Sequence, residues 1–531
     1  MTALPGELQV TGPLPAVADV VVVGAGHNGL VAATLLARTG LSVVVLEAAG
    51  VVGGACRTER PFAKAPDLRA STGAYLLGLM PPELLRTLDV ELPLLRRDPH
   101  YFLPTYGERH LLFGSDRDGL RRQFEDFFSP ADWVADVALQ DELAALRSDL
   151  APAWLAEPLS VEDTAERFVR PALRTAFVDL CRGSVADYLG RFGFASDLVV
   201  AMYAVTDGLS GLSAGPDTPG TGHNFLVHNM CRLPASGGTW MIVHGGMGTV
   251  TSTFADLARA AGATIATSAP VASIEIGDGQ VTGVRLADGR EIGSRVVLGA
   301  CDPFRLRDLA GGSLGEGVDP LLDRARRPGA TLKVNLALSG LPTFTSLPTD
   351  HGQHSATIHL LPQVDDVLGA VREMWADVEA GRLPDFPTIE WYVHSTRDPS
   401  LCDSEGRHTS ALFVQSVPYQ PAGSSWDVEL TSYVEHLLSI CDRFAPGTSE
   451  LVIDTFALPP PEIESHFGIT GGHIHHVDNT IAFADRMPYA AGVDGLYAGS
   501  AGCHPAGSVI GAAGHNAARR ILADLGSKIA T

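Results

Sequence analysis

The sequence predicts an α/β protein in which a Rossmann-like, dinucleotide-binding domain is interleaved with a second domain of mixed α+β structure. A run of β-branched residues, a glycine turn and a helical segment follow one another near the N-terminus, and a second strand, glycine loop and helix occur near the C-terminus. The chain has 531 residues, which is more than one compact core usually organises. We therefore expect two domains, the first of them built from separate stretches of the chain.

The first glycine turn has the parts of a dinucleotide-binding motif. Val20–Val23 form a continuous β-branched run typical of a buried parallel strand, and Leu30 to Arg38 have helical composition. Between them, Gly24, Gly26 and Gly29 allow a tight turn, close approach of a pyrophosphate and close packing of helix on strand. Free amides at the start of the helix can bind the phosphate charge.

The residues after the next strand indicate which dinucleotide is bound. The run Leu41 to Leu46 ends in Glu47, an acid placed to accept hydrogen bonds from ribose hydroxyls. Gly53, Gly54 and Thr58 follow, a pattern typical of flavin-binding two-domain oxidoreductases. Because no second unit of strand, GxGxxG and helix occurs in the sequence, we expect one dinucleotide, and FAD rather than NAD(P).

The C-terminal glycine loop is expected to contact the flavin from the other end of the chain. Gly495 to Ala518 predict a strand, a glycine-rich loop and a helix. Such a helix start lets a planar ring lie against backbone, and its dipole stabilises the negative charge that a flavin gains on reduction. The expected FAD-binding residues are Gly24, Gly26, His27, Asn28, Gly29, Glu47, Gly53, Gly54, Thr58, Val271, Gly502, Val509 and Ile510.

The middle of the chain predicts a helical region and then a series of short strands. Residues 113–205 have apolar residues at helical spacing. From Trp240 onward the pattern predicts the helices Thr251 to Ala261 and Val428 to Arg443, and the strands Thr264–Thr267, Val271–Ile276, Val281–Leu286, Val296–Gly299, Leu332–Leu338, Thr388–Ser395 and Ala411–Val417. We assign residues 16–80, 236–305 and 488–531 to the FAD-binding domain and residues 81–235 and 306–487 to a substrate domain.

These motifs together resemble the phytoene desaturase-like FAD oxidoreductases, and within them the pyridine nucleotide-disulfide oxidoreductase-domain proteins. The N-terminal VVVVGAGHNGLVAA, the GGMGTV after Trp240 and the C-terminal HPxGxVxGAAGxNAA carry the resemblance. It implies an amine oxidase-like fold, non-covalent FAD and dehydrogenation of carbon–carbon bonds. Two departures concern the flavin contacts, since Ala506 interrupts the family's HPGGG and Ala55 replaces an arginine common after the glycine pair.

The resemblance predicts a dehydrogenase or desaturase that passes a hydride to flavin N5 from a carbon–carbon bond of a largely apolar substrate, isoprenoid, polyene-like or cyclic. Oxygen, a quinone or an electron carrier would accept the electrons. One alternative is an FAD-dependent amine oxidase. Lys333 resembles the lysine that holds a water at flavin N5 in those enzymes, but we expect a structural role for it here. Others are a non-redox isomerase or polyene carrier, and a scaffold that retains FAD.

Histidines are the candidate catalytic residues. His504 lies in the C-terminal glycine loop, and His228 precedes the segment that is expected to line the cavity. His473 and His475 alternate on an expected strand and would face the same side. With Asp478 they could suggest a metal site. The resemblance accounts for this segment without a metal, so we expect none.

Composition excludes several classes of function. A net charge of −23 makes nucleic acid an unlikely partner. Seven scattered cysteines without a CxxC motif indicate neither a disulfide framework nor a dithiol redox centre. Gly211, Ser213 and Gly215 match a hydrolase motif, but proline follows where a helix is required. Residues 1–17 carry no Lys or Arg and predict no targeting signal. We expect a cytoplasmic protein, with peripheral membrane contact and homo-oligomer formation left open.

Overall fold

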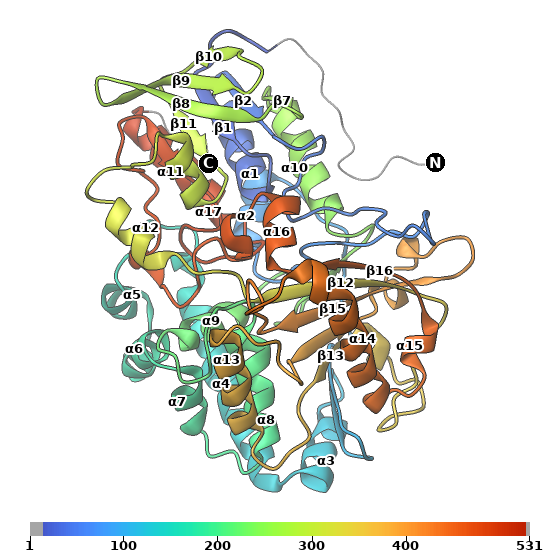
Figure 1. Ribbon diagram of the computed structural model, residues 1–531. Helices are drawn as coiled ribbons and strands as arrows, with labels where there is room; N and C mark the ends of the chain where they lie inside the picture. The colour runs from blue at the N-terminus through green and yellow to red at the C-terminus, as the bar shows by residue number, and fades with distance from the viewer. Residues whose placement is uncertain (1–13, 527–531) are drawn as a thin grey trace.

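The computed structural model of the chain describes residues 14–526. The prediction on a targeting signal therefore falls mostly outside the described residues, as do the last five residues of the expected FAD-binding domain. Figure 1 shows a parallel sheet with its helices in the upper part of the molecule and a larger, mainly antiparallel sheet with a helical layer in the lower part.

The upper sheet has five parallel strands taken from three regions of the chain. Its order is β17-β11-β1-β2-β7. The strands are β1 (Val20–Val23), β2 (Val43–Leu46), β7 (Thr264–Ala266), β11 (Val297–Gly299) and β17 (Leu496–Ala498). Strand β1 lies at the centre, paired with β2 on one side and β11 on the other. This arrangement confirms the predicted Rossmann-like α/β fold.

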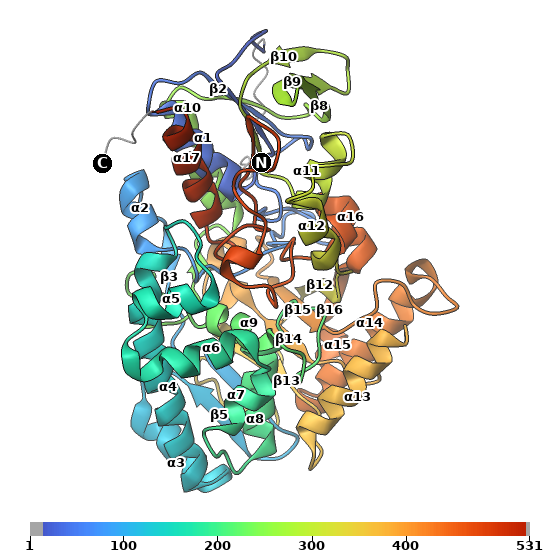
Figure 2. The same cartoon turned by 90° about the vertical axis from the view of Figure 1, so that its left-hand side faces the viewer.

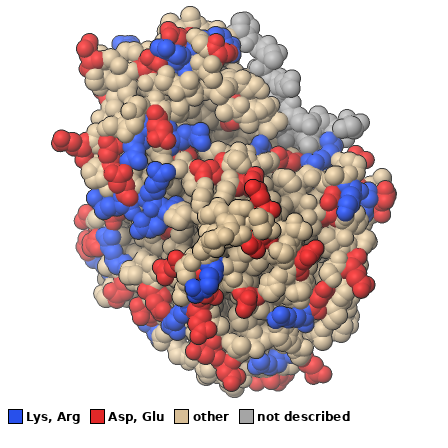
Figure 3. All heavy atoms as spheres, in the orientation of Figure 1, with Lys and Arg blue, Asp and Glu red and all other residues tan. Residues whose placement is uncertain are grey.

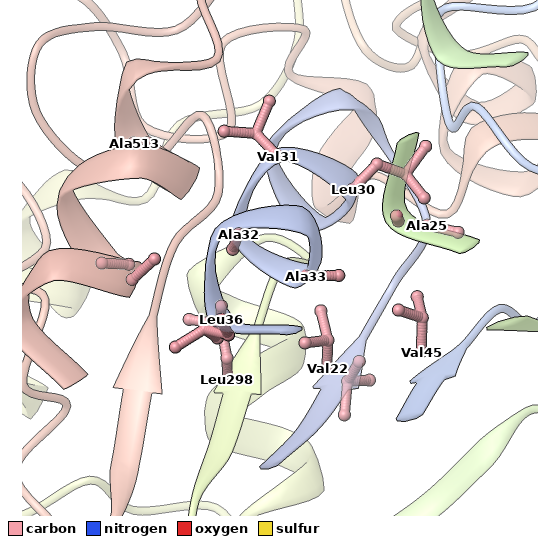
Figure 4. Packing of buried hydrophobic residues seen from close by; sticks show 14 of the residues in the cluster. Val22, Ala25, Leu30, Val31, Ala32, Ala33, Leu36, Val45, Leu298 and Ala513 are labelled. Carbon is pink, nitrogen blue, oxygen red and sulfur yellow. The ribbon is translucent and has the colours of Figure 1, made fainter. Parts of the chain in front are cut away.

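Helix α1 (His27–Ala37) is packed on all sides. Its apolar residues lie against β1, β2 and β11, as Figure 4 shows for Leu36 beside Val22 and Leu298. Helices α10 (Gly248–Ala260) and α17 (Ala512–Asp524) flank α1. Gly29 and Gly514 make these approaches possible, since a Cβ on them would lie 2.2 Å from the carbonyl oxygen of Gly24 and 2.0 Å from that of Asn28. The predicted role of Gly29 in close packing agrees with this geometry.

A small antiparallel sheet and three helices complete the core of the upper part. The sheet consists of β8 (Val271–Gly277), β9 (Gln280–Leu286) and β10 (Glu291–Gly293). The helices are α2 (Pro82–Leu88), α11 (Pro303–Leu309) and α12 (Asp319–Ala325). The hydrophobic core around β1 includes residues of all three helices. It thus extends beyond residues 80 and 305, where the sequence placed the domain boundaries.

The lower sheet has seven strands in the order β16-β12-β15-β14-β13-β4-β5. They are β4 (Tyr101–Pro104), β5 (His110–Phe113), β12 (Thr331–Leu338), β13 (Thr357–Leu360), β14 (Ile389–Tyr392), β15 (His408–Gln415) and β16 (Val452–Leu458). One face is apolar and packs on helix α14 (Trp426–Phe444). Side chains alternate between the two faces of a strand, so the neighbouring residues point to the opposite side. At β4 and β5 that side packs on helices of the lower part, as Leu103 and Phe113 do.

A helical layer lies beside this sheet and faces the viewer at the lower left of Figure 2. It contains α3 (Arg117–Phe127), α4 (Pro130–Leu150), α5 (Val161–Phe168), α6 (Arg174–Arg182), α7 (Val185–Gly190), α8 (Asp197–Tyr203) and α9 (Thr221–His228). Between α8 and α9 the chain forms a π-helical turn, η3 (Ala204–Leu209). Short π-helical segments are frequent at functional sites. The remaining elements are β3 (Leu94–Leu95), β6 (Ile242–Val243), α13 (Val367–Glu379), α15 (Thr448–Leu451) and α16 (Pro460–Phe467).

The histidine-rich segment is not the strand that the sequence predicted. Residues 470–482 form turns, and Gly471, Gly472 and His476 have φ values of 67°, 63° and 62°. A left-handed backbone at these positions cannot continue a strand, although alternation of polar and apolar residues imitated one. The expectation that His473 and His475 share a strand face is therefore wrong.

Two further observations concern the charge of the surface and whether any helix could span a membrane. On the face shown in Figure 3, acidic and basic side chains are interspersed, so the acidity is not gathered into one patch there. Among residues 14–526, no helix combines the length and apolar character needed to cross a bilayer.

Candidate active site

A cavity of about 680 Å³ runs from the glycine turn of the upper domain to the polar face of the lower sheet. Its walls come from both domains. At the upper end they include Gly26, Glu47 and Val271, and at the lower end Lys333 and Glu390. The glycine turn and the inner sheet face therefore open onto one continuous space.

The upper end fits a dinucleotide. Gly26 adopts φ −73° and ψ 172°, and a Cβ on it would meet no atom within 4 Å. The missing side chain thus leaves room in the cavity beside the N-terminus of α1, where free amides can bind a pyrophosphate. His27 and Asn28 line the same space, and His27 Nε2 is buried without a hydrogen-bond partner among the described residues.

Glu47 holds the turn and faces the cavity. Its two carboxylate oxygens accept hydrogen bonds from the amides of Ala25, at 2.8 Å, and Ala49, at 2.9 Å. Gly53 and Gly54 also line the cavity and have φ values of 127° and 56°. A carboxylate fixed in this way beside a glycine-lined space is suited to a ribose.

The remaining expected FAD-binding residues divide into two groups. Val271 and Val509 line the cavity, whereas Thr58, Gly502 and Ile510 do not. Thr58 instead accepts a hydrogen bond from the amide of Gly248 at 3.0 Å and so fixes the start of α10. Gly24 lines the cavity too, while Gly29 packs behind it.

Lys333, Phe413 and Glu390 form a row across the lower sheet, on the face toward the cavity. Phe413 of β15 is in register with Lys333 of β12 on one side and with Glu390 of β14 on the other. All three line the cavity. Residues in register across neighbouring strands point to the same face, so the fold places an amine and a carboxyl group on either side of one aromatic ring.

Burial changes the charge of both polar groups in this row. Burial raises the pKa of Glu390 to about 7. Its carboxylate accepts a hydrogen bond from the hydroxyl of Tyr392 and another from Gln415 Nε2 at 2.7 Å. Burial lowers the pKa of Lys333 well below its ordinary value, and its Nζ lies 3.5 Å from the centre of the Tyr75 ring. A carboxyl group that ionises near neutral pH can act as a base or an acid.

The π-helical turn supplies a second buried acid. Burial raises the pKa of Asp207 to about 7. Its Oδ2 accepts a hydrogen bond from Asn229 Nδ2 at 3.1 Å, and its Oδ1 lies 3.9 Å from His228 Nδ1. His228 lines the cavity, as the sequence predicted, and packs against the ring of Trp240. Burial lowers the pKa of His228 to about 3, so the ring is neutral at physiological pH.

Only one of the other three predicted catalytic histidines reaches the cavity. His475 lines it, and its Nε2 donates to the carbonyl oxygen of Ser210 at 3.0 Å. His473 instead donates to the carboxylate of Asp478 at 2.9 Å, and His504 donates to the carbonyl oxygen of Ala153 at 3.0 Å. Within residues 14–526, no three metal-ligating side chains converge on a common point.

Sequence reasoning did not identify Glu390, Asp207 or Arg97 as cavity residues. A signal existed for Glu390, because an acid interrupts the otherwise apolar strand Ile389–Tyr392. Lys333 similarly interrupts an apolar strand, but the sequence predicted a structural role for it. Asp207 and Arg97 lie in segments with no motif, and their place in the cavity depends on contacts between distant parts of the chain.

Comparisons with known proteins agree with this site. Residues 29–313 match the family of flavin-containing amine oxidoreductases. The chain is 31% identical over 559 residues to pyridine nucleotide-disulfide oxidoreductase domain-containing protein 2 of Mus musculus, a match that covers 96% of this chain and 94% of the mouse protein. It is 27% identical over 545 residues to hydroxyneurosporene desaturase of Cereibacter sphaeroides, covering 96% and 99% of the two chains.

Solved structures with a similar fold are also known. An oxidoreductase from Methanosarcina mazei superposes with a TM-score of 0.59 at 16% identity, over 95% of this chain and 99% of that protein. These findings confirm the predicted resemblance and the predicted cofactor, FAD. The chain belongs to the family of flavin-containing amine oxidoreductases, and it is an FAD-dependent oxidoreductase.

Proposed function

We propose that the protein is a dehydrogenase that removes two hydrogens from a carbon–carbon bond of a largely apolar substrate. The observation that carries this proposal is the single cavity that joins the glycine turn to a buried sheet face. Phe413, Trp240 and Leu76 give the lower end apolar and aromatic walls. Such walls exclude water from the reacting bond and orient an apolar molecule.

The chemistry divides between cofactor and protein. When bound, FAD supplies a hydride acceptor at N5. Loss of the hydride from one carbon must be matched by loss of a proton from the neighbouring carbon, which creates the double bond. We assign that proton to the carboxylate of Glu390, because its pKa near 7 leaves a large ionised fraction at neutral pH. Tyr392 and Gln415 hold the carboxylate in place through their hydrogen bonds.

The relationship to hydroxyneurosporene desaturase of Cereibacter sphaeroides supports dehydrogenation of a carbon–carbon bond, at 27% identity. We propose oxygen, a quinone or an electron carrier as the acceptor that reoxidises the flavin.

Amine oxidation is the second candidate. It is favoured by the family match and by two aromatic rings in the cavity, those of Tyr75 and Tyr392. An aromatic pair could hold an amine only if the two rings were separated. The centroids of these rings are 4.5 Å apart, so the rings contact each other and leave no space for an amine between them. This contact favours the carbon–carbon dehydrogenase.

Anaerobic mixing of the FAD-loaded protein with a panel of substrates tests the proposal. The panel contains polyenes, cyclic hydrocarbons, acyl compounds and amines, and the readout is loss of the oxidised flavin absorbance. We expect the flavin to be bleached by a polyene, cyclic hydrocarbon or acyl compound that has a saturated carbon–carbon bond to oxidise. Bleaching by amines alone would replace this proposal with the amine oxidase, and flavin bound without bleaching by any panel member would overturn both.

A further inference from the structure

The lower end of the cavity contains a buried guanidinium that forms no ion pair with a carboxylate of the described residues. Arg97, between β3 and β4, is 3% exposed and lines the cavity. Its Nε donates to the carbonyl oxygen of Trp240 at 3.1 Å, and its Nη1 donates to Thr357 Oγ1 at 2.9 Å. No carboxylate of residues 14–526 lies within 4.0 Å of it, and no acceptor in that part of the chain binds Nη2.

A second, half-buried arginine also lacks a carboxylate partner. Arg147 of α4 lines the cavity, and its Nε donates to the carbonyl oxygen of Asn229 at 2.5 Å. It forms no ion pair within the described part of the chain. Other arginines of this protein, such as Arg174 and Arg407, are paired with an acid, here Glu166 and Asp403. The cavity wall therefore contains two guanidiniums without a carboxylate partner.

The loop at Gly237 and Gly238 makes room for these groups. Both glycines line the cavity, with φ values of 66° and 85°. A Cβ on Gly238 would lie 2.8 Å from Arg147 Nη1, and a Cβ on Gly237 would lie 3.2 Å from Arg96 Nη2. The same loop ends at Trp240, whose carbonyl oxygen holds Arg97. This segment thus holds Arg97 and leaves room for the heads of Arg96 and Arg147.

The nearby acids Glu390 and Asp207 form no ion pair with Arg97 or Arg147, although each carboxyl group feels the charge of one arginine. Glu390 is bound by Tyr392 and Gln415, and Asp207 is bound by Asn229. Burial raises the pKa of both carboxyl groups to about 7, so a large fraction of each is uncharged at neutral pH. A buried cation without a counter-ion is costly. A bound anion would remove that cost and would accept two parallel hydrogen bonds from a guanidinium.

We propose that Arg97, supported by Arg147, binds a carboxylate group of the substrate, so that the substrate class is an apolar carboxylic acid rather than a hydrocarbon. This inference rests on the proposed function, because it assumes that the substrate occupies the lower end of the cavity. The carboxylate would receive a hydrogen bond from Arg97 Nη2, and the apolar part would extend along Trp240 and Phe413 toward the upper domain.

Calorimetric titration of the FAD-loaded protein with benzoate and with benzamide tests the proposal. The two probes share a ring and differ in charge. We expect benzoate to bind at least tenfold more tightly than benzamide. Arg97→Met should remove this preference, Arg97→Lys should retain part of it, and Arg147→Met should weaken it. Arg122→Met, at an exposed arginine away from the cavity, is the matched control and should bind benzoate as the unaltered protein does.

Equal binding of the two probes, absence of benzoate binding, or an Arg97→Met protein that binds benzoate normally would each overturn the proposal. The comparison of benzoate with benzamide uses the unaltered protein, so it tests the proposed anion site even if Arg97→Met fails to fold. The titration measures binding of the probe and does not depend on flavin reduction. A failure of the anion site is therefore distinguishable from a failure of the proposed dehydrogenase activity, which the anaerobic bleaching experiment reports.

Discussion

Lys333 and Glu390 lie on the same face of the seven-stranded sheet, each in register with Phe413 of the strand between them. Burial shifts the pKa of both groups toward the neutral form, raising that of Glu390 to about 7 and lowering that of Lys333. The row therefore presents an amine and a carboxyl group to the cavity with little net charge, and Glu390 can exchange a proton near neutral pH.

Replacing Glu390 tests its assignment as the base. Glu390→Gln keeps the shape of the side chain but cannot accept a proton, so we expect the rate of anaerobic flavin reduction to fall by about 10² to 10⁴. FAD content should not change, and Glu316→Gln, at an exposed acid, should react normally.

The pH dependence gives an independent check on Glu390. The base is active when ionised, so in the unaltered protein the rate should rise as the pH increases through about 7. Stopped-flow measurement across this range should show no such rise for Glu390→Gln. If the rise persists in that variant, the ionising group is another residue, and Asp207, also with a pKa of about 7, would be the first to examine.

Gly26 allows a direct test of the cofactor site. Its backbone angles suit any residue and its Cβ direction is free of protein atoms, so Gly26→Val should fold normally while its side chain fills the pyrophosphate space. We expect FAD content, measured by absorbance after purification, to fall at least tenfold. Gly317→Ala, at an exposed glycine where a Cβ also meets nothing, should retain its FAD. Full FAD content in Gly26→Val would contradict the site.

Asp478 is expected to stabilise the fold and not to take part in catalysis. Burial alone would raise its pKa, but the hydrogen bond from His473 and those from two backbone amides hold the pKa well below its usual range. Asp478→Ala removes one partner of a buried pair and should cost about 3–5 kcal/mol of unfolding free energy. The control is Asp485→Ala, at an exposed pair with Arg182, which should cost under about 1 kcal/mol. Chemical denaturation measures both, and equal losses would contradict the assignment.

His504 should make the protein sensitive to acid. Burial lowers its pKa to about 4, below the ordinary value of 6.5. Between these two values the unfolded chain binds a proton that the folded chain does not, so stability falls as the pH decreases from 6.5 to 4, by up to about 1.4 kcal/mol per pH unit from this residue. His504→Gln should reduce that slope in denaturation experiments, and His351→Gln, at an exposed histidine, should not. An unchanged slope in His504→Gln would show that the residue does not contribute.

Much of the fold could be predicted because its signals are local. The strand Val20–Val23, the glycine turn after it and the helix that follows are adjacent in sequence, and each has a composition typical of its structure. The same holds for the glycine loop and helix at the C-terminus. The strand prediction for the histidine-rich segment was wrong for the opposite reason. The turns of this segment depend on contacts of Asp478 with Ser213 and His473, which the order of residue types does not reveal.

The site was only partly predictable for a related reason. Glycines of a dinucleotide-binding motif have a fixed spacing, so the sequence could predict that Gly26 and Gly53, with the acid Glu47, lie together, and all three line the cavity. The row of Lys333, Phe413 and Glu390 depends on strand order and register between segments far apart in the chain. His504 was expected at the flavin because of its loop, but the ring donates to Ala153 instead of lining the cavity.

The most direct test of the proposed activity is a single turnover of the FAD-loaded protein without oxygen, followed by mass analysis of the product. We expect one equivalent of an apolar carboxylic acid to bleach one equivalent of flavin and to leave a product lacking two hydrogen atoms. A product of unchanged mass would contradict this expectation and indicate an isomerase, and an imine or aldehyde formed only from amines would indicate an amine oxidase.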